Sequence, residues 1–178
     1  MTPKILLLFL TFFLFNCFAI KHTKTSKKFL SGDCHDCDFK SYSKCDDPQY
    51  IINRATGFYL GRGEVYNTNG LDAVLDYNYD KWCVSKCFIT NTANNLVLDV
   101  SEADLEKKQV ILWPIHGYDR GNQVWTVTKE ITGFSSIKTE TLGSRLALAS
   151  VDSHDPEKGV TLAEFDSEDP RQQWIIQE

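Results

Sequence analysis

From residue 49 to the end of the chain, short apolar runs alternate with polar turns, and no segment keeps a helical period for long. The runs are rich in Ile, Val, Leu, Phe and Thr, whereas Gly, Asn and Asp gather between them. Short runs of this composition, bounded by such turns, are typical of β-strands. The pattern therefore predicts an all-β domain, in which only residues 101–108 would suit a helical turn or two, within a loop.

The strand pattern occurs three times, and each copy ends in a tryptophan. The copies begin near residues 50, 87 and 134, hold about four strand-like runs each, and close at Trp82, Trp125 and Trp174. The three tryptophans stand 43 and 49 residues apart. Because one such unit is too small to bury its apolar face alone, we expect the three units to fold together.

Three units of four strands predict a β-trefoil, in which a six-stranded barrel is capped by three hairpins. Under the pseudo-threefold axis of that fold, the three closing tryptophans would be buried equivalents. A three-bladed propeller is the structural alternative, and we discount it because propellers usually have four or more blades. Residues 49–178 form this single predicted domain.

The first 19 residues are interpreted as a secretory signal peptide rather than as part of the core. Lys4 supplies a positive charge, an apolar run interrupted only by Thr11 spans residues 5–15, and Cys17 and Ala19 are small residues at the cleavage region. This order of regions is typical of signal peptides. The run is short for a transmembrane span, and a retained signal anchor is the alternative. We expect a secreted, extracellular protein without membrane insertion after signal removal.

The charge of the mature chain argues against nucleic-acid binding. Without the signal, 18 basic and 24 acidic residues remain, a formal net charge of −6, and residues 49–178 alone carry −7. Nucleic acid requires a basic face, so we expect no such partner. The Lys- and Cys-rich segment 20–48 has four lysines near its start, and we interpret them as part of a solvated tail.

Five cysteines remain in the mature chain: Cys34, Cys37, Cys45, Cys83 and Cys87. An oxidising compartment favours disulfides, and we predict that Cys83 or Cys87 bonds to a cysteine of the 34–45 segment. An odd number leaves one thiol free or available for an intermolecular disulfide. A metal site at residues 34–37 is the weaker interpretation, because no second Cys/His pair stands at zinc-site spacing. We expect no cofactor.

The stretch 97–125 in the second unit combines three kinds of polar or aromatic group. It holds the carboxylate Asp99, the aromatic Trp113, and the amide pair Asn122 and Gln123. A carboxylate accepts charge-assisted hydrogen bonds from hydroxyls, an indole face covers the apolar face of a pyranose, and an amide both donates and accepts. These groups suit a shallow sugar site. The alternative is that Asp99 is a turn residue and Trp113 belongs to the core.

The second unit resembles a ricin B-chain-type (R-type) lectin repeat, and the Gln-x-Trp-like endings of all three units are similar to that family's hallmark. The resemblance covers residues 49–178. It implies a β-trefoil that binds terminal sugars, often galactose or N-acetylgalactosamine, in glycans or glycoproteins, without catalysis. It also implies the sugar contacts: a carboxylate, a stacking aromatic, a loop residue and an amide pair, namely Asp99, Trp113, His116, Asn122 and Gln123.

One position in the second unit departs from the family pattern. The polar residue that precedes the stacking aromatic by two positions is Ile111 here, and a missing hydrogen bond there would weaken sugar binding or alter sugar choice. We nevertheless expect Asp99, Trp113 and Asn122 to converge on one shallow surface pocket, with Ile111 beneath it and His116 at its lip.

The first and third units lack the set altogether. Their residues at the carboxylate, aromatic and amide-pair positions are Gly61, Asp76 and Tyr79–Asp80 in the first unit, and Ala149, Ala163 and Arg171–Gln172 in the third. Neither unit can both stack on a sugar and accept from it in the manner of the family. We therefore expect a single site.

No catalytic motif accompanies this set. His154 lies among acidic residues in a segment of turn composition, a triad requires members that converge in space, and no Gly-rich phosphate loop follows a strand. We expect a lectin rather than an enzyme. One alternative is a sugar-independent β-trefoil, such as a protease inhibitor or receptor ligand, because fold does not fix function. The other is a lectin module of a multichain toxin or enzyme, tethered through the odd cysteine.

Overall fold

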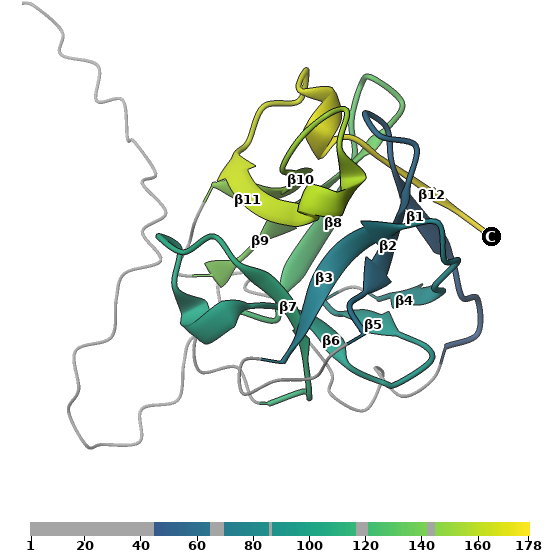
Figure 1. Ribbon diagram of the computed structural model, residues 1–178, viewed down its shortest axis with the longest axis vertical. Helices are drawn as coiled ribbons and strands as arrows, with labels where there is room; N and C mark the ends of the chain where they lie inside the picture. The colour runs from purple at the N-terminus through teal and green to yellow at the C-terminus, as the bar shows by residue number, and fades with distance from the viewer. Residues whose placement is uncertain (1–44, 65–69, 86, 117–120, 142–144) are drawn as a thin grey trace, which may run out of the picture. The chain divides into compact units, whose positions relative to one another are not determined.

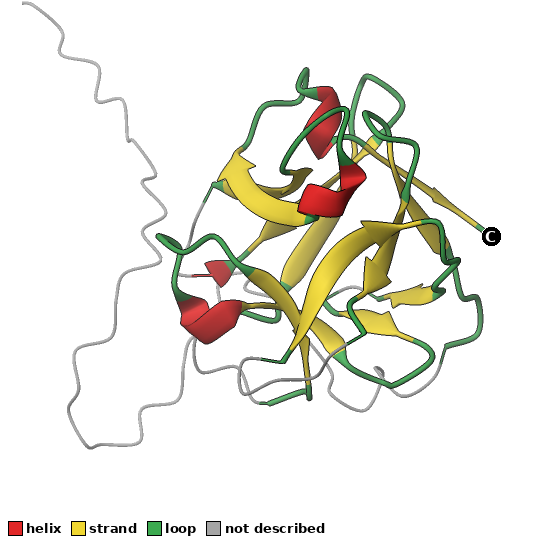
Figure 2. Cartoon of the chain, in the orientation of Figure 1, coloured by secondary structure: helices red, strands yellow, loops and turns green. Residues whose placement is uncertain are grey.

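The computed structural model describes residues 45–64, 70–85, 87–116, 121–141 and 145–178. These residues form twelve strands and three short 3-10 helices, and Figure 2 shows the strands joined by loops. The predicted signal peptide and the cysteines before residue 45 lie outside the described residues. Within the described ranges, no helix is both long and apolar enough to cross a membrane.

The strands fall into three groups of four that match the three units of the sequence (Figure 1). The first unit contains β1 (Tyr50–Asn53), β2 (Tyr59–Arg62), β3 (Leu71–Asp76) and β4 (Trp82–Val84). The second contains β5 (Ile89–Asn91), β6 (Val97–Val100), β7 (Val110–Trp113) and β8 (Trp125–Lys129). The third contains β9 (Ser135–Thr139), β10 (Leu146–Ser150), β11 (Val160–Glu164) and β12 (Trp174–Gln177).

The first and last strands of the units pair into a closed barrel. Consecutive units join through the antiparallel pairs β4–β5, β8–β9 and β12–β1. Within each unit, the closing tryptophan pairs with the residue just before the first strand or at its start, in the pairs Gln49–Trp82, Cys87–Trp125 and Ser135–Trp174. Each barrel strand therefore has two neighbours, which confirms the β-trefoil and rules out separate propeller blades.

The middle two strands of each unit form a hairpin, and the three hairpins meet one another. Figure 1 shows β2–β3, β6–β7 and β10–β11, coloured from blue through teal to yellow-green. Strand β3 pairs with β7 at Leu71–Leu112, and the amide of Leu162 on β11 donates to the carbonyl oxygen of Lys108 at 3.3 Å. The hairpins thus cap the barrel, as the sequence predicted.

The three closing tryptophans occupy equivalent places and carry the strongest sign of threefold symmetry. Trp82, Trp125 and Trp174 are each no more than 1% exposed. Each indole N–H donates to the carbonyl oxygen of a leucine on the second strand of its own unit, at 2.8, 2.8 and 3.0 Å; the acceptors are Leu60, Leu98 and Leu148. A buried indole N–H needs such a partner, so this bond fixes the closing strand against the hairpin.

The core repeats in the same threefold manner. The buried positions are an isoleucine on each first strand, a leucine on each second strand and another leucine on each third strand: Ile51, Ile89, Ile137, Leu60, Leu98, Leu148, Leu75, Leu112 and Leu162. These residues and the tryptophans belong to one cluster. Since every unit contributes equally to it, no unit can bury its apolar face without the other two.

A disulfide joins the start of the described chain to the first unit. Cys45 and Cys83 are bonded, with Cα atoms 5.6 Å apart, which confirms the predicted bond between the 34–45 segment and Cys83 or Cys87. Cys87 is disulfide-bonded as well. Cys34 and Cys37 lie outside the described residues, so the predicted odd thiol stays a prediction.

Candidate functional site

The hairpin β6–β7 places the predicted carboxylate and aromatic on one face of the sheet. In the antiparallel register, Asp99 lies opposite Ile111, and Val97 lies opposite Trp113. Side chains two residues apart on a strand point to the same side. Asp99, Val97, Ile111 and Trp113 therefore share a face, whereas the alternating residues Leu98 and Leu112 enter the barrel core.

Both oxygens of the Asp99 carboxylate accept hydrogen bonds from the predicted amide pair. The Nδ2 of Asn122 donates to Oδ1 at 2.8 Å, and the Nε2 of Gln123 donates to Oδ2 at 2.8 Å. The carbonyl oxygen of Asn122 in turn accepts from the amide of Val100, next to Asp99 on β6, at 2.8 Å. These bonds join the loop before β8 to the end of β6, so residues 23 and 24 positions apart converge.

His116 completes the network from the loop after β7. Its Nε2 lies 3.4 Å from Oδ2 of Asp99, and its side chain is 49% exposed. Its backbone amide donates to Oε1 of Gln123 at 2.9 Å, and Nε2 of Gln123 also donates to the carbonyl oxygen of Pro114 at 3.0 Å. Gln123 thus ties the 114–116 loop to Asp99, and the half-exposed imidazole lies beside the buried carboxylate.

The carboxylate is buried, in contrast to the shallow surface pocket that the sequence predicted. Asp99 is 2% exposed and Asn122 is 4% exposed. Burial raises the pKa of Asp99, because removal from water disfavours the charged form, and this effect outweighs the opposing hydrogen bonds from Gln123 and Asn122 and the proximity of His116.

Trp113 is partly exposed, as predicted, in contrast to the three buried tryptophans. Its ring lies against Gly70, which precedes β3 and has φ of 95°. A Cβ at that glycine would come within 2.8 Å of Cε3 of Trp113 and within 2.7 Å of the carbonyl oxygen of Leu112. Only a glycine combines that backbone conformation with that closeness, so the first unit supplies the space in which the indole sits.

Gln109 does not replace the polar side chain that the family pattern has at the position of Ile111. Ile111 is 4% exposed and faces Asp99 across the hairpin. Gln109, two residues earlier on the same strand parity, donates through Nε2 to Oδ1 of Asp72 at 3.2 Å. The glutamine is therefore directed to the first unit and does not replace the polar residue that the family pattern has at position 111.

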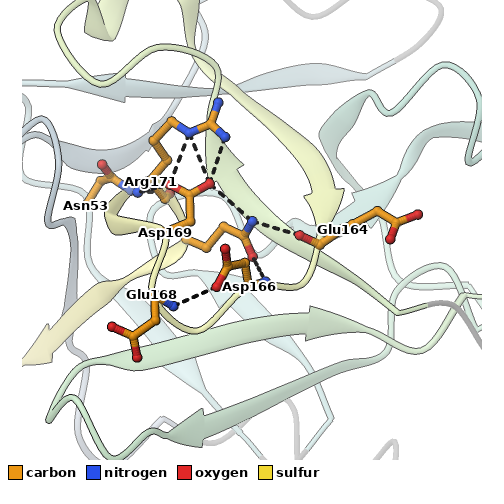
Figure 3. A network of polar contacts seen from close by, with 7 residues as sticks. Asn53, Glu164, Asp166, Glu168, Asp169 and Arg171 are labelled. Atoms are coloured by element: carbon orange, nitrogen blue, oxygen red, sulfur yellow. Dashed lines mark hydrogen bonds and ion pairs between the residues drawn. The ribbon is translucent and has the colours of Figure 1, made fainter.

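The third unit keeps part of this network without its carboxylate (Figure 3). Gln172 occupies the position of Gln123. Its Oε1 accepts from the amide of Asp166 at 3.0 Å, and its Nε2 donates to the carbonyl oxygen of Glu164 at 2.8 Å. These two bonds repeat those of Gln123 to His116 and Pro114. The residue in the place of Asp99 is the fully buried Ala149.

The residue in the place of Asn122 is Arg171, and its partner is local. Its guanidinium donates to Oδ1 and Oδ2 of Asp169, through Nε at 3.1 Å to each oxygen and through Nη2 at 2.7 Å to Oδ2 (Figure 3). The ion pair lowers the pKa of Asp169 below its usual range. The cation and the carboxylate neutralise each other, and Oδ2 of Asp169 also accepts from Nε2 of Gln172 at 3.4 Å.

In the first unit, the carboxylate comes from the segment before the closing strand rather than from the second strand. Gly61 occupies the place of Asp99, and a Cβ built there would lie 3.9 Å from Oδ2 of Asp80. Asp80 itself stands in the place of Gln123. Tyr79, in the place of Asn122, packs edge-to-face on Tyr59 with ring centroids 4.7 Å apart. The sequence alone did not indicate this aromatic arrangement, since the tyrosines are separated by the turns of the hairpin and form no motif along the chain.

Comparison with known proteins agrees with the β-trefoil fold. The sequence matches the ricin-type beta-trefoil lectin domain over residues 85–178, slightly more than half of the chain. No curated protein matches the sequence significantly. These comparisons leave the individual site residues, as well as the division of the chain at residues 19 and 48, as predictions.

Several solved structures share the fold. A designed threefold-symmetric protein, ThreeFoil, is 19% identical, covers 74% of this chain and 98% of its own, and gives a TM-score of 0.60. A Culex salivary protein of the cysteine- and tryptophan-rich family is 19% identical, with coverage of 74% and 92% and a TM-score of 0.61. The C-half of an earthworm R-type lectin, solved with N-acetylgalactosamine, is 19% identical, with coverage of 73% and 97% and a TM-score of 0.53. At these identities the likeness shows the fold alone.

Proposed function

The chain belongs to the ricin-type β-trefoil lectin domain family, and from this premise we propose that it is a secreted lectin whose second repeat binds a terminal sugar of the galactose or N-acetylgalactosamine class. The family supports a carbohydrate-binding role, and the earthworm relative in fold was solved with N-acetylgalactosamine. The single site is built by Asp99, Trp113, His116, Asn122 and Gln123.

One observation carries the proposal, namely a buried carboxylate that the fold does not require. Asp99 is 2% exposed, and removing a carboxylate from water is costly even when it is hydrogen-bonded. The same position holds Gly61 in the first repeat and Ala149 in the third, where the strand pairing and the tryptophan bond are maintained. A carboxylate kept only where an aromatic and two amides accompany it is best explained by a ligand.

The roles follow from the geometry. Asn122 and Gln123 position the carboxylate so that it can accept hydrogen bonds from two neighbouring sugar hydroxyls once the side chain of His116 has turned away. Trp113, which is fixed against Gly70, offers its indole to the apolar face of the ring. Because a polar site exchanges bonds to water for bonds to hydroxyls at small net gain, we expect a Kd on the order of millimolar to tens of micromolar, or about −4 to −6 kcal/mol.

The site acts by binding rather than by catalysis. Within the described ranges, the groups that hydrogen-bond or ion-pair with Asp99 are the two amides and His116, with no second carboxylate among them. Most glycosidases need a pair of carboxyl groups that flank the scissile bond. A single carboxylate with both oxygens bound by amides suits recognition of hydroxyls.

Secretion is supported by the N-terminal sequence and by the cysteines. Residues 1–19 have the composition of a signal peptide, and the Cys45–Cys83 disulfide is typical of proteins that mature in an oxidising compartment. Expression in a eukaryotic host followed by mass spectrometry of the medium tests this part: we expect a chain that begins after residue 19. A non-reducing gel of the same material would reveal a tethered partner as a band that disappears on reduction.

The experiment for the sugar site is a titration of the mature, ¹⁵N-labelled protein with lactose and with N-acetylgalactosamine. The amide signal of Val100, which donates to Asn122, should shift in a saturable manner. Asp99→Ala should abolish this shift while the rest of the spectrum stays folded. The matched control is Asp166→Ala, because Asp166 is a loop carboxylate at the equivalent of His116 and should leave the shift of Val100 unchanged.

The rival candidate is a sugar-independent β-trefoil that binds a protein. It is favoured by the burial of Asp99 and Asn122, which would suit a purely structural network. In that case, no sugar, including any chosen as a probe from a glycan array, shifts the amide signal of Val100. The variant Asp99→Ala then gives the same titration result as the parent.

A further inference from the structure

The outer face of the second-repeat hairpin continues onto the first repeat. Strand β3 pairs with β7, where Asp72 lies opposite Ile111, and β7 pairs with β6, where Ile111 lies opposite Asp99. Residues that lie opposite each other in antiparallel strands project their side chains to the same side of the sheet. Asp72, Ile111 and Asp99 therefore form one row across three strands, with a carboxylate at each end and an apolar residue between them.

The carboxylate of Asp72 is open to solvent, whereas that of Asp99 is buried. Asp72 is exposed, and its Oδ1 accepts from Nε2 of Gln109 at 3.2 Å. Within the ranges that the structure describes, no donor binds Oδ2 of Asp72. A carboxylate that is held through one oxygen keeps the lone pairs of the other oxygen for a ligand.

The two ends of the row differ in their surroundings. At one end, the side chains of Asn122 and Gln123 bind the carboxylate of Asp99, so their segment occupies that end. At the other end, the backbone amide of Gly63 donates to the carbonyl oxygen of Asp72 at 2.8 Å. Because glycine has no side chain, Gly63 places nothing beside the carboxylate of Asp72.

The length of the row sets the size of a ligand that uses both carboxylates. Neighbouring strands lie about 4.8 Å apart, so the Cα atoms of Asp72 and Asp99 are separated by about 10 Å. This span exceeds one pyranose ring and suits two linked rings. Trp113 stands two residues from Ile111 on β7, shares its face and is partly exposed. A terminal ring that stacks on Trp113 and binds Asp99 therefore leaves the next ring above Ile111, toward Asp72.

We propose that Asp72 is a specificity-determining residue of the second-repeat site, and that this site takes a disaccharide or longer glycan whose second ring donates a hydroxyl to Oδ2 of Asp72. The inference rests on the proposed sugar-binding function of Asp99 and Trp113. Asp72 supplies, from the neighbouring repeat, the polar contact that the side chain of Ile111 cannot make. The second repeat then selects the terminal sugar, and the first repeat selects the sugar that follows it.

The charges around the row favour a neutral glycan. Strands β3, β6 and β7 contain three aspartates and no lysine or arginine. The loop 101–109 between β6 and β7 adds three acidic residues and two lysines. His116 beside Asp99 contributes at most one positive charge, and the guanidinium of Arg62 on β2 lies 3.8 Å from the carboxylate of Asp80. Because these groups are negative on balance, they disfavour a glycan whose second unit carries a carboxylate.

The amides of Val100 and Gly63 report the two ends of the row, because they donate to the carbonyl oxygens of Asn122 and Asp72. The ¹⁵N-labelled mature protein is titrated with methyl β-galactoside and lactose, and with N-acetylgalactosamine and its β1,4-linked disaccharide with N-acetylglucosamine. We expect the preferred monosaccharide to shift Val100 alone and the matching disaccharide to shift both signals. One added hydrogen bond should lower the Kd roughly three- to tenfold.

This titration distinguishes failure of the inference from failure of the proposed function. Equal Kd values for a monosaccharide and its disaccharide, or a Gly63 signal that never shifts, would overturn the role of Asp72 and leave the second-repeat site standing. A shift of Gly63 without Val100 would show that the two carboxylates do not share a ligand, which also overturns the inference. If none of the four sugars shifts either signal, both proposals fail.

Variants of Asp72 assign the contact. Asp72→Ala should raise the Kd for the disaccharide to that for the monosaccharide and leave the Kd for the monosaccharide unchanged. The parent should bind lactobionate, in which the second unit carries a carboxylate, more weakly than lactose. Asp72→Asn should narrow this difference, because it removes the opposing charge and keeps an acceptor oxygen.

The matched control is Asp76→Ala. Asp76 lies on the same strand and the same face as Asp72, but its two oxygens are bound locally by the amide of Tyr77 and by Asn78. This variant should keep the preference of the parent for the disaccharide. If Asp72→Ala retains that preference, or if Asp76→Ala loses it to the same extent as Asp72→Ala, the assignment of Asp72 is wrong.

Discussion

The second and third repeats both hold the loop after their third strand in place through a glutamine, but the polar groups around that glutamine differ. In both, a glutamine before the closing strand ties down the loop that follows the third strand: Gln123 binds Pro114 and His116, and Gln172 binds Glu164 and Asp166. The second repeat adds the buried carboxylate of Asp99, whereas the third has Ala149.

The comparison of Asp99 with Ala149 distinguishes hydrogen bonds that both repeats share from those that only the second repeat has. The glutamine–loop bonds occur in both repeats, so they form whether or not the buried carboxylate is present. The bonds of Asn122 and Gln123 to Asp99 occur in one repeat only, and they satisfy a charge whose burial disfavours folding. The Gln-x-Trp ending therefore has the same structural role in both repeats, and the residue opposite it on the second strand is the one that differs between them.

The largest expected effect tests the shared scaffold. Trp125→Ala and Trp174→Ala each remove a fully buried indole and its hydrogen bond to a leucine carbonyl, so each should lower the free energy of unfolding by roughly 3–5 kcal/mol. Urea unfolding followed by circular dichroism measures both. Values that differ by more than about 2 kcal/mol between the two variants would contradict the equivalence of the repeats.

The second test transfers the carboxylate to the repeat that lacks it. Ala149→Asp places a charge at a fully buried position, where Arg171 already pairs with Asp169, so it should destabilise the protein by at least about 2 kcal/mol. Asp99→Ala should change stability by no more than about 1 kcal/mol, because lost hydrogen bonds and relieved desolvation oppose each other. If Ala149→Asp is as stable as the parent, the third repeat accommodates a carboxylate as well as the second does, and burial of Asp99 ceases to indicate function.

The third test compares the two glutamines. Gln172→Ala should cost about 1 kcal/mol through its loop bonds, and Gln123→Ala should cost about 1–2 kcal/mol more, because it also leaves Oδ2 of Asp99 without its amide donor. Thermal and urea denaturation of the paired variants measure this difference. Equal losses would show that the bond between Gln123 and Asp99 contributes nothing to stability.

The smallest expected effect is on the pH dependence of stability, to which Asp99 and Asp169 should contribute with opposite signs. The pKa of Asp99 is raised above 3.8 by burial, so ionisation of Asp99 lowers stability as pH rises from 3.8 through the raised pKa. The pKa of Asp169 is lowered below 3.8 by Arg171, so its contribution is present above pH 3.8 and is lost as pH falls through the lowered pKa. Asp99→Asn and Asp169→Asn should remove slopes of opposite sign from curves of stability against pH, and slopes of the same sign would contradict these environments.

The sequence predicted the fold because the fold is repeated in it. The apolar positions of the strands recur together with a closing tryptophan at Trp82, Trp125 and Trp174. Three copies of one pattern identify the strands with less ambiguity than a single short run does. A disulfide from Cys83 or Cys87 to the 34–45 segment was predicted from the place of these cysteines near the end of the first repeat in a chain with a signal-like start, and Cys83 makes it. Family resemblance then selected Asp99, Trp113, His116, Asn122 and Gln123, and all of these except Trp113 meet in one network of polar contacts around Asp99.

The tertiary structure alone decided how accessible each group is and which elements face one another. Asp99 is buried with His116 beside it, and Gln109 donates to Asp72. These outcomes depend on the loop after β7 and on the packing of one hairpin against the next. In the first repeat, the packing of Tyr79 on Tyr59 and the approach of Asp80 to Gly61 likewise join positions that are far apart along the chain. Periodicity along a chain specifies which side of its own strand a residue takes, but solvent access and contacts between repeats are fixed only when the three hairpins close around a common core.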